Sequence, residues 1–161
     1  MIKFLLFEIL IVHYDSYAVF DYTDFLNHIH HQRPDGLLTT CNGFNPCDLN
    51  SSDFGRVSVR GQQVNGVYEK QALREGQVTA AGCYYFSAWQ LFKNCAMRYL
   101  QEVKESGRRF YVSEVYNEML KEGRVVVSYP VKRFISFGRP HDVLSFKYWE
   151  RVFLTPPIPS C

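Results

Sequence analysis

The chain has 161 residues, of which 47% are hydrophobic, 21% charged and 16% aromatic, which is enough for one folded domain with a buried core. Lysine and arginine number 18 and aspartate and glutamate 16, so the net charge of +2 gives no electrostatic reason to expect nucleic-acid or membrane partners. The five cysteines lack C-x-x-C spacing, which argues against a disulfide scaffold or a structural zinc site and favours reduced cysteines in a cytoplasmic protein.

An apolar run over residues 4–12 opens the chain. It is interrupted by Glu8 and is much shorter than the roughly 20 apolar residues of a transmembrane helix. No small-x-small cleavage site follows it, so we expect a strand that is buried on both faces. The alternative is a signal peptide over residues 1–12, which predicts a cleaved N-terminus and oxidised cysteines.

Helical and strand patterns alternate through the first half of the chain. They predict a helix over 24–31, a strand over 37–41, a loop over 42–53 and strands over 56–60 and 64–70. Phe25 and Ile29 share one face of the helix. The last two strands form a hairpin that turns near Gly61, and Asn65-Gly66 is a competing turn signal.

The second half of the chain continues the alternation. It predicts a strand over 79–86, a helix capped by Ser87, a helix capped by Ser113, strands over 125–127 and 134–137, and a helix from Pro140. We therefore expect an α/β fold with a mixed, mainly parallel sheet flanked by helices. One domain spans residues 1–155, and the proline-rich residues 156–161 form a tail.

Several nucleotide-binding motifs are absent from the sequence. No two glycines are closer than five positions apart, so G-x-G-x-x-G cannot occur. Gly61 and Gly66 have the spacing of a P-loop, but Val67 and Tyr68 stand where lysine and serine or threonine are required.

Charged residues at strand ends are the positive signals. Asp15 follows the N-terminal apolar run, and an aspartate at the carboxyl end of a strand is well placed to hold Mg²⁺ against phosphate oxygens. Glu69 and Lys70 close another strand, where a carboxylate can accept sugar hydroxyls and an ammonium can hold a phosphate. The structural alternatives are a turn or capping aspartate and a surface ion pair.

Six short segments stand in a fixed order along the chain. They are Asp15 after the apolar run, FGRV over 54–57, VYEK over 67–70, AGCYYF over 81–86, FYVSEVYN over 110–117 and FISFGRPHD over 134–142. In this order they resemble the sugar-1-phosphate nucleotidyltransferase family, whose members make NDP-sugars, and they are most similar to members associated with surface-polysaccharide genes. The resemblance extends from about Ile9 to Phe153. It implies a Rossmann-like nucleotidyltransferase domain.

The resemblance implies a reaction between a sugar 1-phosphate and a nucleoside triphosphate, with Mg²⁺ as cofactor. Asp15 matches the aspartate that binds the catalytic Mg²⁺, and Lys70 matches the catalytic lysine on the sugar phosphate. Glu69 would bind sugar hydroxyls. Gly55 matches a glycine whose backbone approaches the sugar, because it has no side chain. Ala80 and Gly82 would line the sugar pocket.

The chain departs from the family pattern at three places. Ser136 stands where many members have a second metal-binding aspartate, with Asp142 near by, and Arg139 replaces a small hydroxyl residue. Only 14 residues precede Asp15, so the family's first strands and its glycine-rich triphosphate loop are not expected in this chain. The alternative function is therefore a non-catalytic sugar-phosphate-binding remnant or subunit, which could form a homo-oligomer through an unfinished sheet edge.

Overall fold

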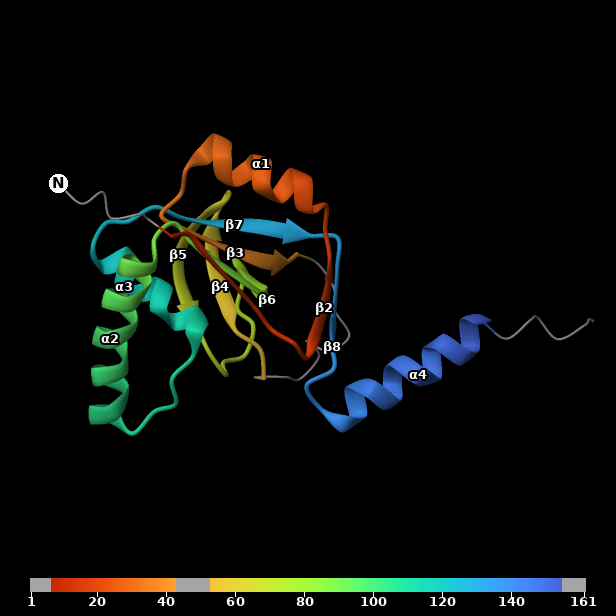
Figure 1. Ribbon diagram of the computed structural model, residues 1–161. Helices are drawn as coiled ribbons and strands as arrows, with labels where there is room; N and C mark the ends of the chain where they lie inside the picture. The colour runs from red at the N-terminus through yellow and green to blue at the C-terminus, as the bar shows by residue number, and fades with distance from the viewer. Residues whose placement is uncertain (1–6, 43–52, 155–161) are drawn as a thin grey trace, which may run out of the picture.

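The computed structural model describes residues 7–42 and 53–154 (Figure 1). Its strands are β1 (Ile9–Val12), β2 (Ser16–Val19), β3 (Gly36–Cys41), β4 (Arg56–Arg60), β5 (Gln63–Tyr68), β6 (Gln77–Phe86), β7 (Val126–Val131) and β8 (Arg133–Ser136). Its helices are α1 (Tyr22–Gln32), α2 (Trp89–Ser106), the 3-10 turn η2 (Val112–Glu114), α3 (Val115–Lys121) and α4 (Pro140–Leu154). Half of the segment of the alternative signal peptide (residues 1–6), most of the expected loop over 42–53 and the tail lie outside the described residues.

The main sheet has the strand order β1-β6-β3-β7-β5-β4, and β4 also pairs with β6, so that part of the sheet closes on itself. Among the described strands, β3 and β7 form the one parallel pair. The expectation of a mainly parallel sheet is therefore wrong. The reason is that β6 runs antiparallel to each of its three neighbours, while β4 and β5 form the expected hairpin at Gly61.

Helices cover both faces of the main sheet, with α1 on one face and α2 and α3 on the other (Figure 1). Successive residues of a strand point to opposite faces, so neighbouring side chains enter different cores. Leu37 packs with Phe25 of α1, whereas Leu38 packs with Tyr116 of α3. Both leucines are fully buried. This burial on both faces explains the nearly continuous apolar runs of the central strands.

A small second sheet joins β2 to β8 as an antiparallel pair. Strand β2 was not predicted, because its four residues carry no strong strand pattern. The N-terminal strand was predicted to be buried on both faces, and this is wrong. Within the described residues β1 pairs with β6 alone, at the edge of the sheet, and it leaves Leu10 and Val12 exposed.

The helix boundaries follow local chemistry in some places and not in others. The Asp21 carboxylate caps α1 by accepting hydrogen bonds from the Thr23 and Asp24 amides at 2.8 and 3.1 Å. The two serine caps are wrong. Helix α2 begins after Ala88 with no side-chain cap, and Ser113 lies inside η2 with its hydroxyl turned toward another partner.

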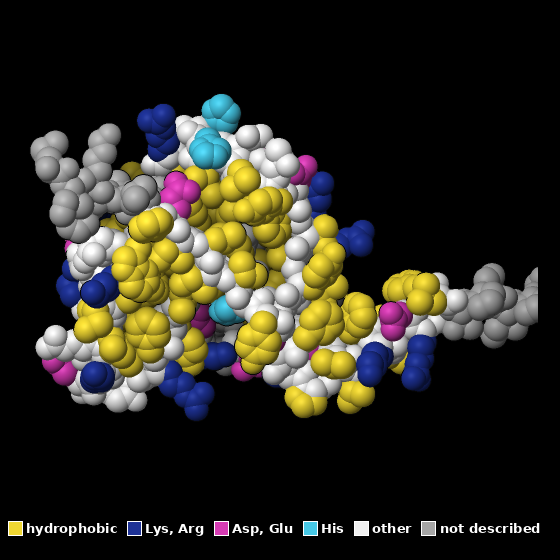
Figure 2. All heavy atoms as spheres, in the orientation of Figure 1, with side chains coloured by type: hydrophobic (Ala, Val, Ile, Leu, Met, Phe, Trp, Pro, Cys, Tyr) yellow, Lys and Arg dark blue, Asp and Glu magenta, His cyan; other side chains and the backbone are white. Residues whose placement is uncertain are grey.

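Helix α4 projects away from the body of the domain (Figure 1). Asp142 is its buried residue, whereas Leu144 and Phe153 are 67% and 79% exposed. Figure 2 shows apolar side chains along this helix, mixed with charged ones. No helix among the described residues combines the length and the hydropathy needed to cross a membrane.

The packing of α1 on the sheet predicts that a substitution at Phe25 destabilises the chain. Phe25 is fully buried, and its ring lies 5.3 Å from that of Tyr129, centroid to centroid. We expect Phe25→Ala to lower the free energy of unfolding by about 3–5 kcal/mol, because it leaves a cavity between α1 and the sheet. Urea denaturation measures this. Met97→Ala, at a 59% exposed position on α2, is the control and should change the value by less than about 0.5 kcal/mol. A similar loss in both variants would contradict this account of the core.

Candidate functional site

A cavity of about 280 Å³ opens beside the carboxyl end of β5. Its lining comes from the turn between β1 and β2, the residues before β4, the residues after β5, the middle of β6, η2 and the segment from β8 to α4. Every residue that the sequence predicted for catalysis or binding lines this cavity: Asp15, Gly55, Glu69, Lys70, Ala80 and Gly82. The structure therefore brings these distant residues together, and their individual roles stay predictions.

Gly82 brings the turn that carries Asp15 to the cavity. It lies on β6 between the residues that pair with β4 and those that pair with β1, and its φ of +78° is in the left-handed region that favours glycine. Its carbonyl accepts a hydrogen bond of 2.8 Å from the His13 amide. A Cβ atom at this position would lie 2.9 Å from the Ser16 hydroxyl oxygen. A larger residue here would therefore push the turn away from the strand.

The Asp15 carboxylate lies near the start of α4. One of its oxygens would be 3.1 Å from a Cβ atom built on Gly138, and its backbone carbonyl accepts a 2.8 Å hydrogen bond from the Phe137 amide. No group of three metal-binding side chains was found among the described residues. Asp15 can still hold Mg²⁺, because this ion is commonly bound by one or two carboxylates together with substrate phosphates. The residues present thus fit a metal that arrives with a phosphorylated substrate.

Asp142 is paired with Arg139. The guanidinium donates through Nε and Nη2 to the two carboxylate oxygens at 3.1 and 3.0 Å, and the Ser136 hydroxyl donates to Oδ2 at 3.2 Å. Burial by itself raises the pKa of Asp142, but the hydrogen bonds and charge of Arg139 outweigh it and hold the pKa below its ordinary value. Asp142 therefore stays ionised as the partner of Arg139.

Gly55 gives the Glu69 carboxylate its place in the cavity. A Cβ atom on Gly55 would lie 2.5 Å from Glu69 Oε1 and 3.3 Å from the Ala80 Cβ atom. The Gly55 carbonyl also accepts a 2.9 Å hydrogen bond from the Ala80 amide. The absence of a side chain at Gly55 therefore lets the carboxylate lie against the backbone of the segment before β4.

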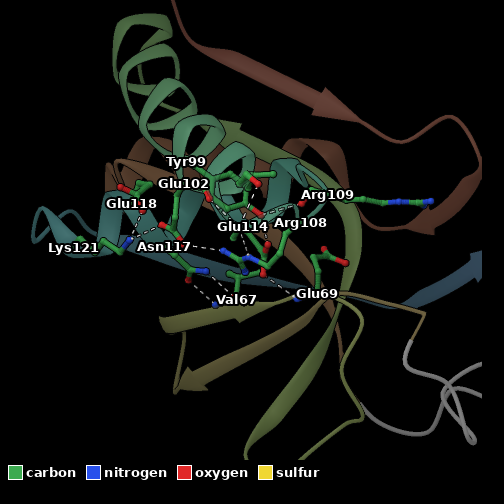
Figure 3. A network of polar contacts seen from close by, with 12 residues as sticks. Val67, Glu69, Tyr99, Glu102, Arg108, Arg109, Glu114, Asn117, Glu118 and Lys121 are labelled. Carbon is green, nitrogen blue, oxygen red and sulfur yellow. Dashed lines mark hydrogen bonds and ion pairs between the residues drawn. The ribbon is translucent and has the colours of Figure 1, made fainter.

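Polar contacts from η2 and α3 fix the end of β5 (Figure 3). The Ser113 hydroxyl donates to Glu69 Oε1, and Glu114 Oε1 accepts a 3.3 Å hydrogen bond from the Glu69 amide. Asn117 bonds both backbone groups of Val67, at 2.9 Å to the amide and 2.7 Å to the carbonyl. Sequence reasoning assigned Ser113 only as a helix cap and missed its contact with Glu69, since a serine before a helix is typical of a cap.

Lys70 follows Glu69 in an uncommon conformation, with a φ of +57°. Its ammonium donates to the Asp53 carbonyl and lies 5.9 Å from the centre of the Tyr111 ring. The fully buried Arg56 supports this bend, because its Nε donates to the Gln71 carbonyl at 3.3 Å. A strained residue held in place by its surroundings at a cavity is typical of functional sites.

The partly buried position of Glu69 predicts a pH dependence of stability. Burial raises its pKa from the ordinary value of 4.5, and this outweighs the hydrogen bond from Ser113 and the charges of Lys70 and Arg56. Between 4.5 and the raised pKa the unfolded chain releases this proton while the folded chain keeps it, so the free energy of unfolding falls as the pH rises. Thermal unfolding from about pH 4 to 8 should show this decrease, and Glu69→Gln should lack it.

The matched control is Glu75→Gln, at an exposed position before β6. Its pH profile should follow that of the unmodified chain. If the pH profile of thermal unfolding of Glu69→Gln is also parallel to that of the unmodified chain across this range, the Glu69 carboxyl does not have the raised pKa that its burial predicts.

Comparisons with known proteins support the fold of the chain. No family model matches the sequence, and no curated protein matches it. Solved structures do match it. A nucleoside-diphosphate-sugar pyrophosphorylase from Vibrio cholerae RC9 has a TM-score of 0.65 at 19% identity, over 86% of this chain and 55% of that one. A candidate glucose-1-phosphate thymidylyltransferase from Bacillus anthracis, in complex with sucrose, has a TM-score of 0.65 at 15% identity, over 89% and 55%.

The inositol-1-phosphate CTP transferase from T. maritima has a TM-score of 0.58 at 12% identity, over 96% of this chain and 58% of that one. This chain thus spans between 55% and 58% of the length of these three proteins. At such low identities the likeness concerns the fold. The chain has the fold of the sugar-phosphate nucleotidyltransferases, as the order of its motifs implied.

Proposed function

We propose that this chain belongs to the sugar-1-phosphate nucleotidyltransferases and that its cavity binds a sugar 1-phosphate. The reaction would transfer a nucleotidyl group from a nucleoside triphosphate, giving an NDP-sugar for surface-polysaccharide synthesis and pyrophosphate. The observation that carries this proposal is the convergence of Asp15, Glu69 and Lys70 on one cavity, within a fold shared with such enzymes.

The cavity has the size and the chemistry for a sugar. Its volume of about 280 Å³ is near the lower end of small-molecule pockets, which run from about 300 to 1,000 Å³, and it suits a monosaccharide better than a whole nucleotide-sugar. The Glu69 carboxylate would accept hydrogen bonds from sugar hydroxyls. Gly55 and Ala80 would leave room for the ring, because neither has a long side chain. The hydrogen bonds from sugar hydroxyls to the Glu69 carboxylate would be charge-assisted, and such bonds are among the stronger ones.

The phosphate would lie at the Lys70 end of the cavity. Its oxygen would attack the α-phosphorus of the triphosphate, forming one P–O bond as the bond to the β-phosphate oxygen breaks and pyrophosphate leaves. Lys70 would hold the attacking phosphate and neutralise charge, and Asp15 would orient the phosphates through a bound Mg²⁺, which supplies further charge neutralisation. Positioning and electrostatic stabilisation account for most of the catalysis in phosphoryl transfer.

A second candidate is a sugar-phosphate-binding module without turnover. Its support is that Asp142 and Asp53 both pair with Arg139, while Ser136 offers only a hydroxyl, a far weaker Mg²⁺ ligand than a carboxylate. Metal binding at that end of the cavity would then depend on Asp15.

We also propose a cytoplasmic location and self-association of the chain. The exposed apolar side chains of β1 and α4 support self-association, and the measured molar mass tests it.

Pyrophosphate release separates these candidates, and a substitution at Lys70 tests the site that they share. We expect Mg²⁺-dependent pyrophosphate release with a panel of sugar 1-phosphates and triphosphates, and Lys70→Ala should lower it about 10²- to 10³-fold, as does loss of one donor that stabilises developing charge. Asp15→Asn should raise the Mg²⁺ concentration required. Lys147→Ala, at an exposed position on α4, is the control and should leave the rate unchanged.

The same proteins are titrated with glucose 1-phosphate by ligand-detected NMR. Lys70-dependent binding with no pyrophosphate release would favour the binding module. If no sugar phosphate binds and no pyrophosphate is released, both candidates are wrong.

A further inference from the structure

One aspartate bridges two cations of the cavity. The backbone carbonyl of Asp53 accepts a hydrogen bond from the Lys70 ammonium, and its carboxylate pairs with Nη1 of Arg139. All three residues line the cavity, although they come from segments far apart in the sequence. One residue thus contacts both positive groups that an anionic ligand would meet, Lys70 through its backbone carbonyl and Arg139 through its carboxylate.

The Arg139 guanidinium is held in a fixed orientation by contacts on the edge that faces away from Asp53. Nε and Nη2 donate to Asp142, whose carboxylate is nearly fully buried, and the guanidinium lies 5.7 Å from the centre of the Phe54 ring. His141 Nε2 also lies 3.1 Å from Asp142 Oδ1. Because Asp142 occupies the other edge, the Nη1 edge is the one that meets Asp53. A planar cation fixed on one edge presents the other for paired hydrogen bonds to an oxyanion.

We propose that Arg139 is a second phosphate-binding cation of this cavity and that the Asp53 carboxylate occupies the phosphate position when no anionic ligand is bound. The identity of that phosphate as part of a sugar 1-phosphate rests on the proposed function. The phosphate would replace the Asp53 carboxylate on Nη1 and lie between Arg139 and Lys70. Asp142 is a positioning residue in this arrangement, because it holds the guanidinium and does not touch the ligand.

The proposal predicts effects of opposite sign at two residues. Asp53→Asn removes the competing charge, so it should bind glucose 1-phosphate and inorganic phosphate several-fold more tightly than the unmodified chain does. Arg139→Gln should weaken the binding of both about tenfold, the usual effect of losing a hydrogen bond to a charged group. Neither change should alter the binding of glucose itself. Arg124→Gln, near the start of β7 and outside the cavity lining, is the control.

Isothermal titration with glucose 1-phosphate, glucose and inorganic phosphate measures these effects. Because Arg139→Gln removes the guanidinium that pairs with the buried Asp142 and could unfold the chain, Asp53→Asn is the independent test at an exposed position. Asp53→Asn with unchanged or weaker phosphate binding would overturn the role of Asp53. A folded Arg139→Gln with unchanged binding would overturn the role of Arg139, and an unmodified chain that binds neither phosphate ligand would overturn both.

These outcomes separate the inference from the proposed function. Phosphate binding that depends on Arg139 and Asp53, in a chain that neither prefers glucose 1-phosphate nor releases pyrophosphate, would support the inference and contradict the proposed function. Glucose 1-phosphate binding that depends on Lys70 but is not changed by substitution of Arg139 or Asp53 would support the proposed function and contradict the inference.

Discussion

The site depends on one constraint, the pairing of β6 with three other strands. Along one edge β6 pairs with β3, and along the other it pairs first with β4 and then with β1. Gly82 lies where the second edge changes partner, with a backbone conformation that favours glycine. This change of partner brings the Asp15 turn from one side and the Gly55 segment from the other to the same cavity. The cavity therefore follows from the sheet topology and not from a single local motif.

A second set of contacts sets the electrostatics of the cavity. Glu69 is partly buried, which raises its pKa, and its oxygen and amide are bonded by Ser113 and Glu114. Lys70 and Arg139 also line the cavity, and both contact Asp53. The cavity thus combines a carboxylate suited to hydroxyl groups with two cations suited to a phosphate. A phosphorylated sugar carries both kinds of group, which supports the proposed ligand.

Much of the fold could be predicted from the sequence, because periodicity and turn residues act locally. Helix α1, the hairpin at Gly61 and the long strand β6 were all expected close to their observed places. The direction of the strands could not be predicted, since a buried strand has the same apolar pattern in parallel and antiparallel pairs. The contact of Ser113 with Glu69 was missed because a serine hydroxyl bonds a helix amide and a distant carboxylate equally well. The pairing of Arg139 with Asp53 joins residues 86 positions apart, a distance over which no local pattern is informative.

The central claim is that this cavity is a sugar-phosphate site, and a crystal structure of the chain with glucose 1-phosphate tests it most directly. We predict that the sugar hydroxyls lie within hydrogen-bond distance of the Glu69 carboxylate. The phosphate should lie between the Lys70 ammonium and the Arg139 guanidinium, with the Asp53 carboxylate displaced. A ligand bound elsewhere on the chain, or bound in the cavity with its phosphate away from both cations, would contradict the account.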